Sequence, residues 1–259
     1  MRVGAIIEAR MNSTRLPGKV MLPILGKPML EKQVERLRRS LLVDTIVVAT
    51  PEAEVNKPIW DWCATQPDVH LYKGDEEDVL KRVLEAARIT KTDVIVENTG
   101  DCPLVDPFIL DLVTGYVICG HQVCVNILPP TWPKGMDIRV FTTDVLADSE
   151  PKTLNIKALC NFEWRNNVST YLYRKDSEYD VRTIEAQEGE ICPKLNLSVD
   201  DEADYKRVKD IFETLEPVNP SFGIRDILTY LATLPTYYDL INTPKLFKPA
   251  TWMTAEPAK

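Results

Sequence analysis

A short segment near the start of the chain gathers three cations and several small polar residues. It reads Arg10-Met11-Asn12-Ser13-Thr14-Arg15-Leu16-Pro17-Gly18-Lys19. Arginine can make forked hydrogen bonds to phosphate oxygens, and lysine acts as a point charge. A glycine lets the backbone approach a ligand closely, so backbone N–H groups can join the cations. The segment matches neither a Walker loop nor G-x-G-x-x-G, and a solvated basic turn is the alternative, but its chemistry suits a phosphate chain.

Two aspartates elsewhere could hold a divalent metal ion. Asp101 lies in Thr99-Gly100-Asp101-Cys102-Pro103, and Asp200 lies in Ser198-Val199-Asp200-Asp201-Glu202-Ala203-Asp204. Each segment follows an apolar run typical of a strand. Carboxylate oxygens suit magnesium, which keeps waters and phosphate oxygens as its other ligands. The alternatives are a turn aspartate at Asp101 and a helix N-cap at Asp200 or Asp201.

Alternating apolar segments predict the elements that would position these side chains. Strands are expected at 3–7, 45–49, 69–72 and 94–96, and helices at 28–41, 75–89 and 106–116. Later strands are expected at 122–128, 137–141 and 195–199, and later helices at 200–215 and 224–234. Strands that alternate with helices at this spacing indicate βαβ units. We therefore expect an α/β fold with a mixed, mostly parallel sheet flanked by helices. The carboxyl ends of parallel strands form one edge, where such sheets bind ligands.

Composition narrows the function further. The chain has 259 residues and a net charge of -8, which disfavours a nucleic-acid partner but still allows a small nucleotide. Its six cysteines form no CxxC pair and only two histidines accompany them, so a zinc cluster is not expected. No apolar stretch reaches the roughly 20 residues of a membrane span, and we expect a cytoplasmic protein without a membrane partner. One domain is expected over 1–242, with a loosely attached tail over 243–259.

Together these segments resemble the CMP-KDO synthetase-like cytidylyltransferases, most closely the SpsF-type branch named for spore-coat polysaccharide synthesis. The pattern A-R-x-x-S-T-R-L-P-G-K is matched by Ala9, Arg10 and Ser13 to Lys19. Residues 26–30 resemble G-K-P-x-L, Gly74 and Arg82 fit a strand–G–helix–R segment, 99–104 match T-G-D-C-P-L, and 199–204 match V-D-x-x-x-D. The matches extend from residue 4 to about residue 215.

The resemblance implies a Mg²⁺-dependent enzyme that transfers CMP from CTP to a small anionic acceptor and releases pyrophosphate. It implies that Arg10, Arg15 and Lys19 hold the CTP phosphates as catalytic residues, and that Asp101 and Asp200 bind magnesium. The nucleotide-binding set is Ala9, Arg10, Ser13, Thr14, Arg15, Gly18, Lys19, Gly74, Arg82, Gly100 and Asp101. The resemblance further implies a Rossmann-like, nucleotide-diphospho-sugar transferase-like domain and a homodimer. In that domain we expect a nucleotide half at about 1–118 and an acceptor and dimer half at about 119–242.

Some positions depart from the branch. Glu97 stands where an arginine often precedes T-G-D, and Asn166-Asn167 stands in Arg165-Asn166-Asn167-Val168-Ser169 where many relatives read R-E-H-V-T. Lys134-Gly135-Met136-Asp137 resembles a P-x-G-x-D stretch and is a candidate acceptor wall. The acceptor is left open between acidic sugars, sugar phosphates and small phosphonates or phosphates. The alternatives are a nucleotidyltransferase with another base preference or an isoprenoid-type acceptor, a catalytically silent regulatory subunit and a scaffolding protein.

Overall fold

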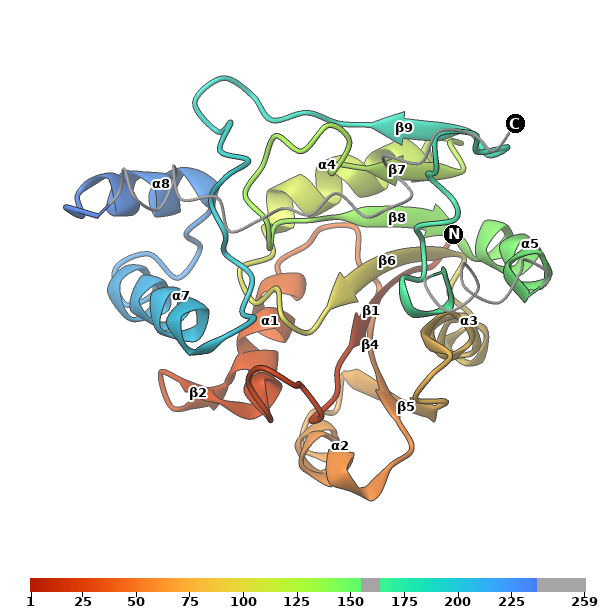
Figure 1. Ribbon diagram of the computed structural model, residues 1–259, viewed down its shortest axis with the longest axis horizontal. Helices are drawn as coiled ribbons and strands as arrows, with labels where there is room; N and C mark the ends of the chain where they lie inside the picture. The colour runs from red at the N-terminus through yellow and green to blue at the C-terminus, as the bar shows by residue number, and fades with distance from the viewer. Residues whose placement is uncertain (155–163, 237–259) are drawn as a thin grey trace.

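The computed structural model describes residues 1–154 and 164–236. Within this part of the chain, a seven-stranded sheet has the order β5-β4-β1-β6-β8-β7-β9 (Figure 1). The strands are β1 Val3–Glu8, β4 Thr45–Pro51, β5 Val69–Gly74, β6 Val94–Thr99, β7 Val123–Val125, β8 Arg139–Thr142 and β9 Val181–Thr183. Strands β5, β4, β1 and β6 are parallel, and β8 is antiparallel to both of its neighbours. A small hairpin of β2 Pro23–Ile24 and β3 Lys27–Pro28 follows the first loop.

Helices cover both faces of the sheet. The helices are α1 Met29–Leu37, α2 Lys57–Ala64, α3 Val79–Thr90, α4 Pro107–Ile118, α5 Thr143–Leu154, α7 Glu202–Leu215 and α8 Ile224–Ala232, with short 3-10 turns at η1 Lys19–Met21 and η2 Glu54–Asn56. One apolar core joins α1, α2, α4, α7 and α8 to one face, and a second joins α3 and α5 to the other. In strand β1, the side chain of Ile7 packs in the first core and that of Ile6 packs in the second. The strand is therefore buried on both faces, as central parallel strands are.

The predicted α/β fold with a mixed, mostly parallel sheet is confirmed, with two local corrections. The segment 195–199 is not a regular strand, because Asn196 forms only an isolated bridge with Lys134. Pro133 has no N–H to donate, and Gly135 turns the chain away with φ +97°, so the pairing cannot extend. The first helix ends at Leu37 rather than near residue 41.

The start of helix α3 differs from the prediction, which began that helix at residue 75. Helix α3 begins at Val79 with Asp78 as its N-cap, because the Asp78 side chain accepts a hydrogen bond from the N–H of Lys81. The predicted tail at 243–259 lies outside the described residues. No helix in the described part of the chain combines the length and apolar character needed to cross a bilayer.

Candidate active site

The first loop, residues 10–19, is shaped by its backbone. The Met11 carbonyl accepts hydrogen bonds from the N–H groups of Ser13, at 2.9 Å, and Gly18, at 2.8 Å, which closes the loop on itself. Gly18 has φ +71°, a left-handed conformation that glycine adopts without strain. The cationic side chains take no part in these bonds, and Arg10 and Arg15 are exposed. The loop is therefore closed by its backbone, and its cationic side chains are left to make contacts outside the loop.

A buried asparagine anchors this loop to the next strand. The Asn56 side chain accepts a hydrogen bond from the Met11 N–H at 2.8 Å and donates one to the Pro51 carbonyl at 3.2 Å. Asn56 is fully buried, and it lies in η2, immediately before α2. The sequence reasoning missed this residue, because its partners are about 45 residues away in the sequence or belong to the backbone.

Asp101 is brought to the same edge by the end of β6. The Gly100 N–H donates to the Glu8 carbonyl at 2.9 Å, and a Cβ at position 100 would lie 3.0 Å from that same oxygen. Glycine therefore allows the ends of β1 and β6 to meet closely. The Asp101 carbonyl accepts the N–H of Val199 at 2.8 Å, which ties this turn to the segment that carries Asp200.

Asp200 is not the helix N-cap. Asp201 caps α7, since its side chain accepts a hydrogen bond from the Asp204 N–H. The Asp200 carboxylate instead meets three cations: Arg15 at 2.9 Å, Lys134 at 2.7 Å and Lys19 at 3.6 Å. Burial alone would raise the pKa of Asp200, but the hydrogen bond from Lys134 and the three positive charges outweigh it and lower that pKa. The residue is thus held ionised in a network of charges.

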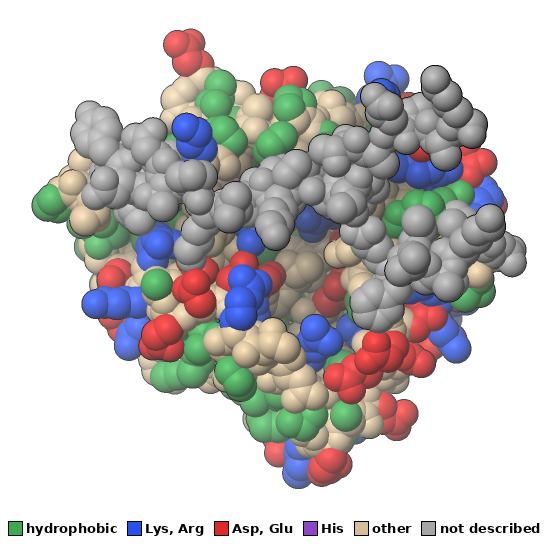
Figure 2. Space-filling view, in the orientation of Figure 1, with side chains coloured by type: hydrophobic (Ala, Val, Ile, Leu, Met, Phe, Trp, Pro, Cys, Tyr) green, Lys and Arg blue, Asp and Glu red, His purple; other side chains and the backbone are tan. Residues whose placement is uncertain are grey.

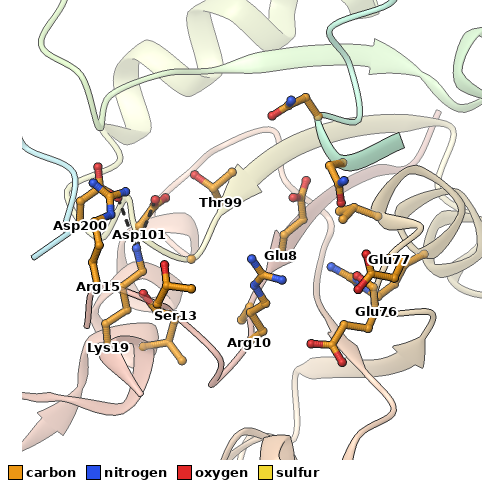
Figure 3. A pocket seen from close by; sticks show the side chains of 18 residues that line it. Glu8, Arg10, Ser13, Arg15, Lys19, Glu76, Glu77, Thr99, Asp101 and Asp200 are labelled. Carbon is orange, nitrogen blue, oxygen red and sulfur yellow. Dashed lines mark hydrogen bonds and ion pairs between the residues drawn. The ribbon is translucent and has the colours of Figure 1, made fainter. Parts of the chain in front are cut away.

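Lys19 lies between the two predicted metal ligands. Its ammonium nitrogen is 3.4 Å from Asp101 Oδ2 and 3.6 Å from Asp200 Oδ1, and it donates to the Val199 carbonyl at 2.6 Å (Figure 3). Two carboxylates that contact one ammonium nitrogen from different segments are also close enough to bind one cation. Two hard oxygen donors fit magnesium, whose other ligands would be waters and phosphate oxygens. Among the described residues, no group of three or more metal-ligating side chains occurs.

Lys134 is a second residue whose place at this centre the sequence did not predict. Its backbone N–H donates to the Leu195 carbonyl at 3.0 Å, and its carbonyl accepts the Leu197 N–H at 2.7 Å. A Cβ on Gly135 would lie 2.5 Å from the backbone at Leu197 and Ser198, so glycine is required for this close contact. The K-G-x-D segment was expected to form an acceptor wall, and the structure brings its lysine to Asp200.

The first loop and the two aspartates line a cavity of about 630 Å³, within the usual range for small-molecule sites. In the space-filling view, basic and acidic side chains gather around a hollow near the middle of this face (Figure 2). Of the predicted site residues, those lining the cavity are Ala9, Arg10, Ser13, Thr14, Arg15, Lys19, Arg82, Gly100, Asp101 and Asp200. Gly18 and Gly74 do not line it. A Cβ on Gly74 would lie 2.8 Å from the Tyr72 ring and 3.0 Å from Arg82 Cγ, so glycine leaves room for both side chains.

The opposite end of the cavity has a different character. Figure 3 shows Glu8 near its centre, with Glu76 and Glu77 on the side away from Asp200. Burial, and then the nearby charge of Glu97, raise the pKa of Glu8 well above its ordinary value. Arg82 donates to the carbonyls of Asp75 and Glu76. Glu8 was read only as the residue after an apolar strand, because periodicity does not show what a strand's last side chain faces.

Comparison with known proteins agrees with this geometry. Residues 4–117 match the family model described as cytidylyltransferase. The spore coat polysaccharide biosynthesis protein SpsF of Bacillus subtilis is 30% identical over 234 residues, which is 89% of this chain and 94% of that protein. The 3-deoxy-manno-octulosonate cytidylyltransferase of Geobacter sulfurreducens is 36% identical over 111 residues, 43% of each chain. A solved cytidylyltransferase from Leptospira borgpetersenii superposes with a TM-score of 0.81 at 28% identity, covering 93% of this chain and 98% of that one.

Proposed function

This chain belongs to the cytidylyltransferase family, and we propose that it transfers CMP from CTP to a small anionic acceptor with release of pyrophosphate. One observation carries the proposal. The Lys19 ammonium lies between Asp101 and Asp200 beside an exposed cationic loop. This arrangement joins a cluster of phosphate-binding cations to a pair of metal-binding carboxylates, as activation of a nucleoside triphosphate requires.

The proposed reaction is an in-line displacement at the α-phosphorus of CTP. An acceptor oxygen forms a bond to that phosphorus, the bond to the bridging oxygen breaks, and pyrophosphate leaves with the electron pair. Arg10, Arg15 and Lys19 would hold the phosphate oxygens. To do so, Arg15 and Lys19 would give up their contacts with Asp200. Asp101 and Asp200 would hold Mg²⁺, which supplies charge neutralisation for the triphosphate and the leaving pyrophosphate. An acceptor phosphate or carboxylate is already anionic, so it needs no base.

The remaining predicted residues have supporting roles in this proposal. The Thr14 backbone and the Ser13 side chain would join the phosphate contacts, Gly18 would shape the loop, and Ala9 and Gly100 permit the close approach of strand ends. Arg82, with space left by Gly74, would contact the nucleotide. We keep the division into a nucleotide half, about 1–118, and an acceptor half, about 119–242, as part of the proposal. The family match over residues 4–117 supports the first half. A homodimer follows from the resemblance alone.

Ligand-induced stabilisation tests the nucleotide. Each of CTP, UTP, ATP and GTP is added with MgCl₂ to the purified protein, and the melting temperature is measured. At about 100 times its Kd, CTP should raise Tm by roughly 5–10 °C, the linkage effect expected for a chain of this size. An equal or larger shift with a purine nucleotide would reject the assignment to CTP. Pyrophosphate release with a panel of anionic acceptors then tests transfer itself.

A further inference from the structure

Two glutamates lie on one face of the sheet where the far end of the cavity begins, and this end extends from Glu8, near the centre, away from Asp200. Glu8 ends β1 and lines the cavity, and Glu97 on β6 is in register with Ile6. Because side chains alternate along a strand, Glu8 and Ile6 share a face, and Glu97 lies behind Glu8 on that face. Glu97 is only 4% exposed. The two carboxyl groups therefore form one buried pair that opens to the cavity through Glu8.

One oxygen of each carboxyl group in this pair lacks a hydrogen-bond partner among the described residues. Among the described residues, neither Oε1 of Glu8 nor Oε2 of Glu97 has a hydrogen-bond partner, although both atoms are buried. The hydroxyl of Ser169, which is 1% exposed, lies beside Glu97, and its hydrogen bond opposes the effect of burial on the pKa of Glu97. Leaving a buried polar atom unpaired costs about 1–3 kcal/mol, and more if it is charged. Because Glu8 lines the cavity, its unpaired oxygen indicates that a ligand completes the arrangement there.

This end of the cavity is also short of positive charge. The carboxyl groups of Glu8, Glu97 and Asp137 share two guanidinium groups, those of Arg139 and Arg82, and Lys134 adds a positive charge near Asp137 alone. Arg139 makes its ion pair with Asp137, at 3.7 Å. Asp101 adds a further nearby negative charge on the side of Glu8 that faces Lys19. Burial raises the pKa of all three carboxyl groups, and the guanidinium groups, Lys134 near Asp137 and the Ser169 hydrogen bond to Glu97 oppose this only in part.

We propose that the acceptor carries an amino group and that its ammonium binds to Glu8, with Glu97 as a positioning residue behind it. This inference rests on the proposed function and specifies its acceptor as a small zwitterion, such as an amino sugar phosphate or an aminoalkyl phosphonate. An ammonium offers up to three N–H donors to unpaired oxygens, and it adds the missing positive charge. A hydroxyl group could satisfy one oxygen but would leave the charge unbalanced.

The departures from the SpsF-type pattern lie around this same pair. Glu97 replaces an arginine of the pattern, which changes the local charge by two units and favours a cation over an anion. Asn166 and Asn167, which stand in place of an acidic–histidine pair, line the cavity with Glu8. The anionic end of the acceptor would then face the cationic loop and Lys134. The acceptor half of the site is thus altered in charge, while the nucleotide half keeps its motif.

Matched acceptors test this proposal. Pyrophosphate release from CTP is measured with aminoethylphosphonate against propylphosphonate and hydroxyethylphosphonate, and with glucosamine phosphate against glucose phosphate. We expect kcat/KM to be higher for the amino member by on the order of 10- to 100-fold, the value of a hydrogen bond to a charged group. Glu8→Gln should remove the preference and Glu97→Gln should reduce it, chiefly through KM. Glu213→Gln, which removes an exposed carboxylate of α7, should leave it unchanged.

The outcomes separate this proposal from the one it rests on. Equal use of amino and amino-free acceptors, or a preference that survives Glu8→Gln, would overturn the amino-group assignment. So would a protein that CTP stabilises but that uses none of the amino acceptors. If CTP does not stabilise the protein at all, the proposed function itself fails. Glu8→Gln keeps the size of the side chain, and a normal melting curve verifies that the variant folds.

Discussion

The two ends of the cavity handle buried charge in opposite ways. At the end that holds Asp101 and Asp200, carboxylates meet Arg15, Lys19 and Lys134 at distances of 2.7–3.6 Å. At the other end, Glu8 and Glu97 have buried oxygens without hydrogen-bond partners among the described residues. The first end is a complete network of charges, whereas the second lacks a donor.

This difference indicates how each end responds to a ligand. A metal ion and a triphosphate must exchange partners at the first end, because cations already occupy the space between the carboxylates. The free energy of binding at the first end is therefore the difference between the new contacts to metal and phosphate and the lost contacts between the carboxylates and their cations. A ligand at the second end adds partners to atoms that have none. The first end therefore suits the reacting groups, and the second suits recognition of the acceptor.

The largest effect is expected from removing charge at the paired carboxylates. Asp101→Asn and Asp200→Asn should each lower turnover by about 10³-fold or more, and the double variant should lose little further, because the residues act as one unit. Pyrophosphate release measures this. The neighbouring Asp201→Asn is the control, because asparagine caps a helix about as well as aspartate, and its turnover should stay near normal. Additive losses in the double variant would contradict a shared metal site.

The same variants also test stability. Mutual repulsion of two bare carboxylates would make each asparagine variant more stable, but Lys19 already lies between them. We therefore expect Asp200→Asn to cost on the order of 1 kcal/mol, because it removes the partner of three cations. In a chain of this size that corresponds to about 2–4 °C in Tm.

A smaller effect is expected from the cation between them. Lys19→Ala should lower kcat/KM by on the order of 10²-fold, as the loss of one well-placed electrostatic stabiliser does. The fold should survive, because the loop is closed by backbone hydrogen bonds to Met11 rather than by Lys19. Lys27→Ala removes a half-exposed cation of the neighbouring hairpin and serves as the control. Near-normal turnover of a folded Lys19→Ala protein would return the loop to a solvated basic turn.

The paired end could largely be predicted from the sequence. Arg10, Lys19 and Asp101 follow strands, and parallel strands deliver such loops to one edge. Asp200 lies at the same edge but not for the expected reason, because the segment before it forms an isolated bridge instead of a strand. Its position depends on the contact of Lys134 and Gly135 with residues 195–198, which are about 60 residues away in the sequence. No local pattern encodes that contact.

The unpaired end could not be predicted. Glu8 and Glu97 lie in strands where periodicity shows burial but does not show which residues become neighbours. Their proximity follows from the register of β1 with β6. The shortage of positive charge follows from the partners of the two arginines, because Arg139 pairs with Asp137 and Arg82 donates to the Asp75 carbonyl. Asn56 was missed for a similar reason, since its role depends on the Met11 N–H in a distant loop. The departure from the family pattern at Glu97 could be seen in the sequence. The excess of negative charge that it creates depends on its neighbours in the fold, which the sequence does not show.

The smallest expected effect concerns pH, and it distinguishes the two ends by sign. Burial raises the pKa of Glu8, so its ionisation costs stability in the folded state. This cost is absent below the unfolded pKa, about 4.3 for glutamate, and grows as pH rises toward the folded pKa. The lowered pKa of Asp200 acts in the opposite direction, with stability present above its unfolded value, about 3.9, and lost as pH falls through the folded one.

Glu8→Gln should therefore match the wild type in Tm at low pH and exceed it increasingly as pH rises. The gain should be of the order of 1 kcal/mol, the usual scale for a single polar substitution, or about 2–4 °C. Melting temperatures without nucleotide over roughly pH 3–9 measure it, with Glu213→Gln as the control. For Asp200→Asn the loss relative to wild type should instead shrink toward acid pH. Parallel pH profiles for Glu8→Gln and wild type would show that Glu8 has a partner in solution, and the contrast between the two ends would then disappear.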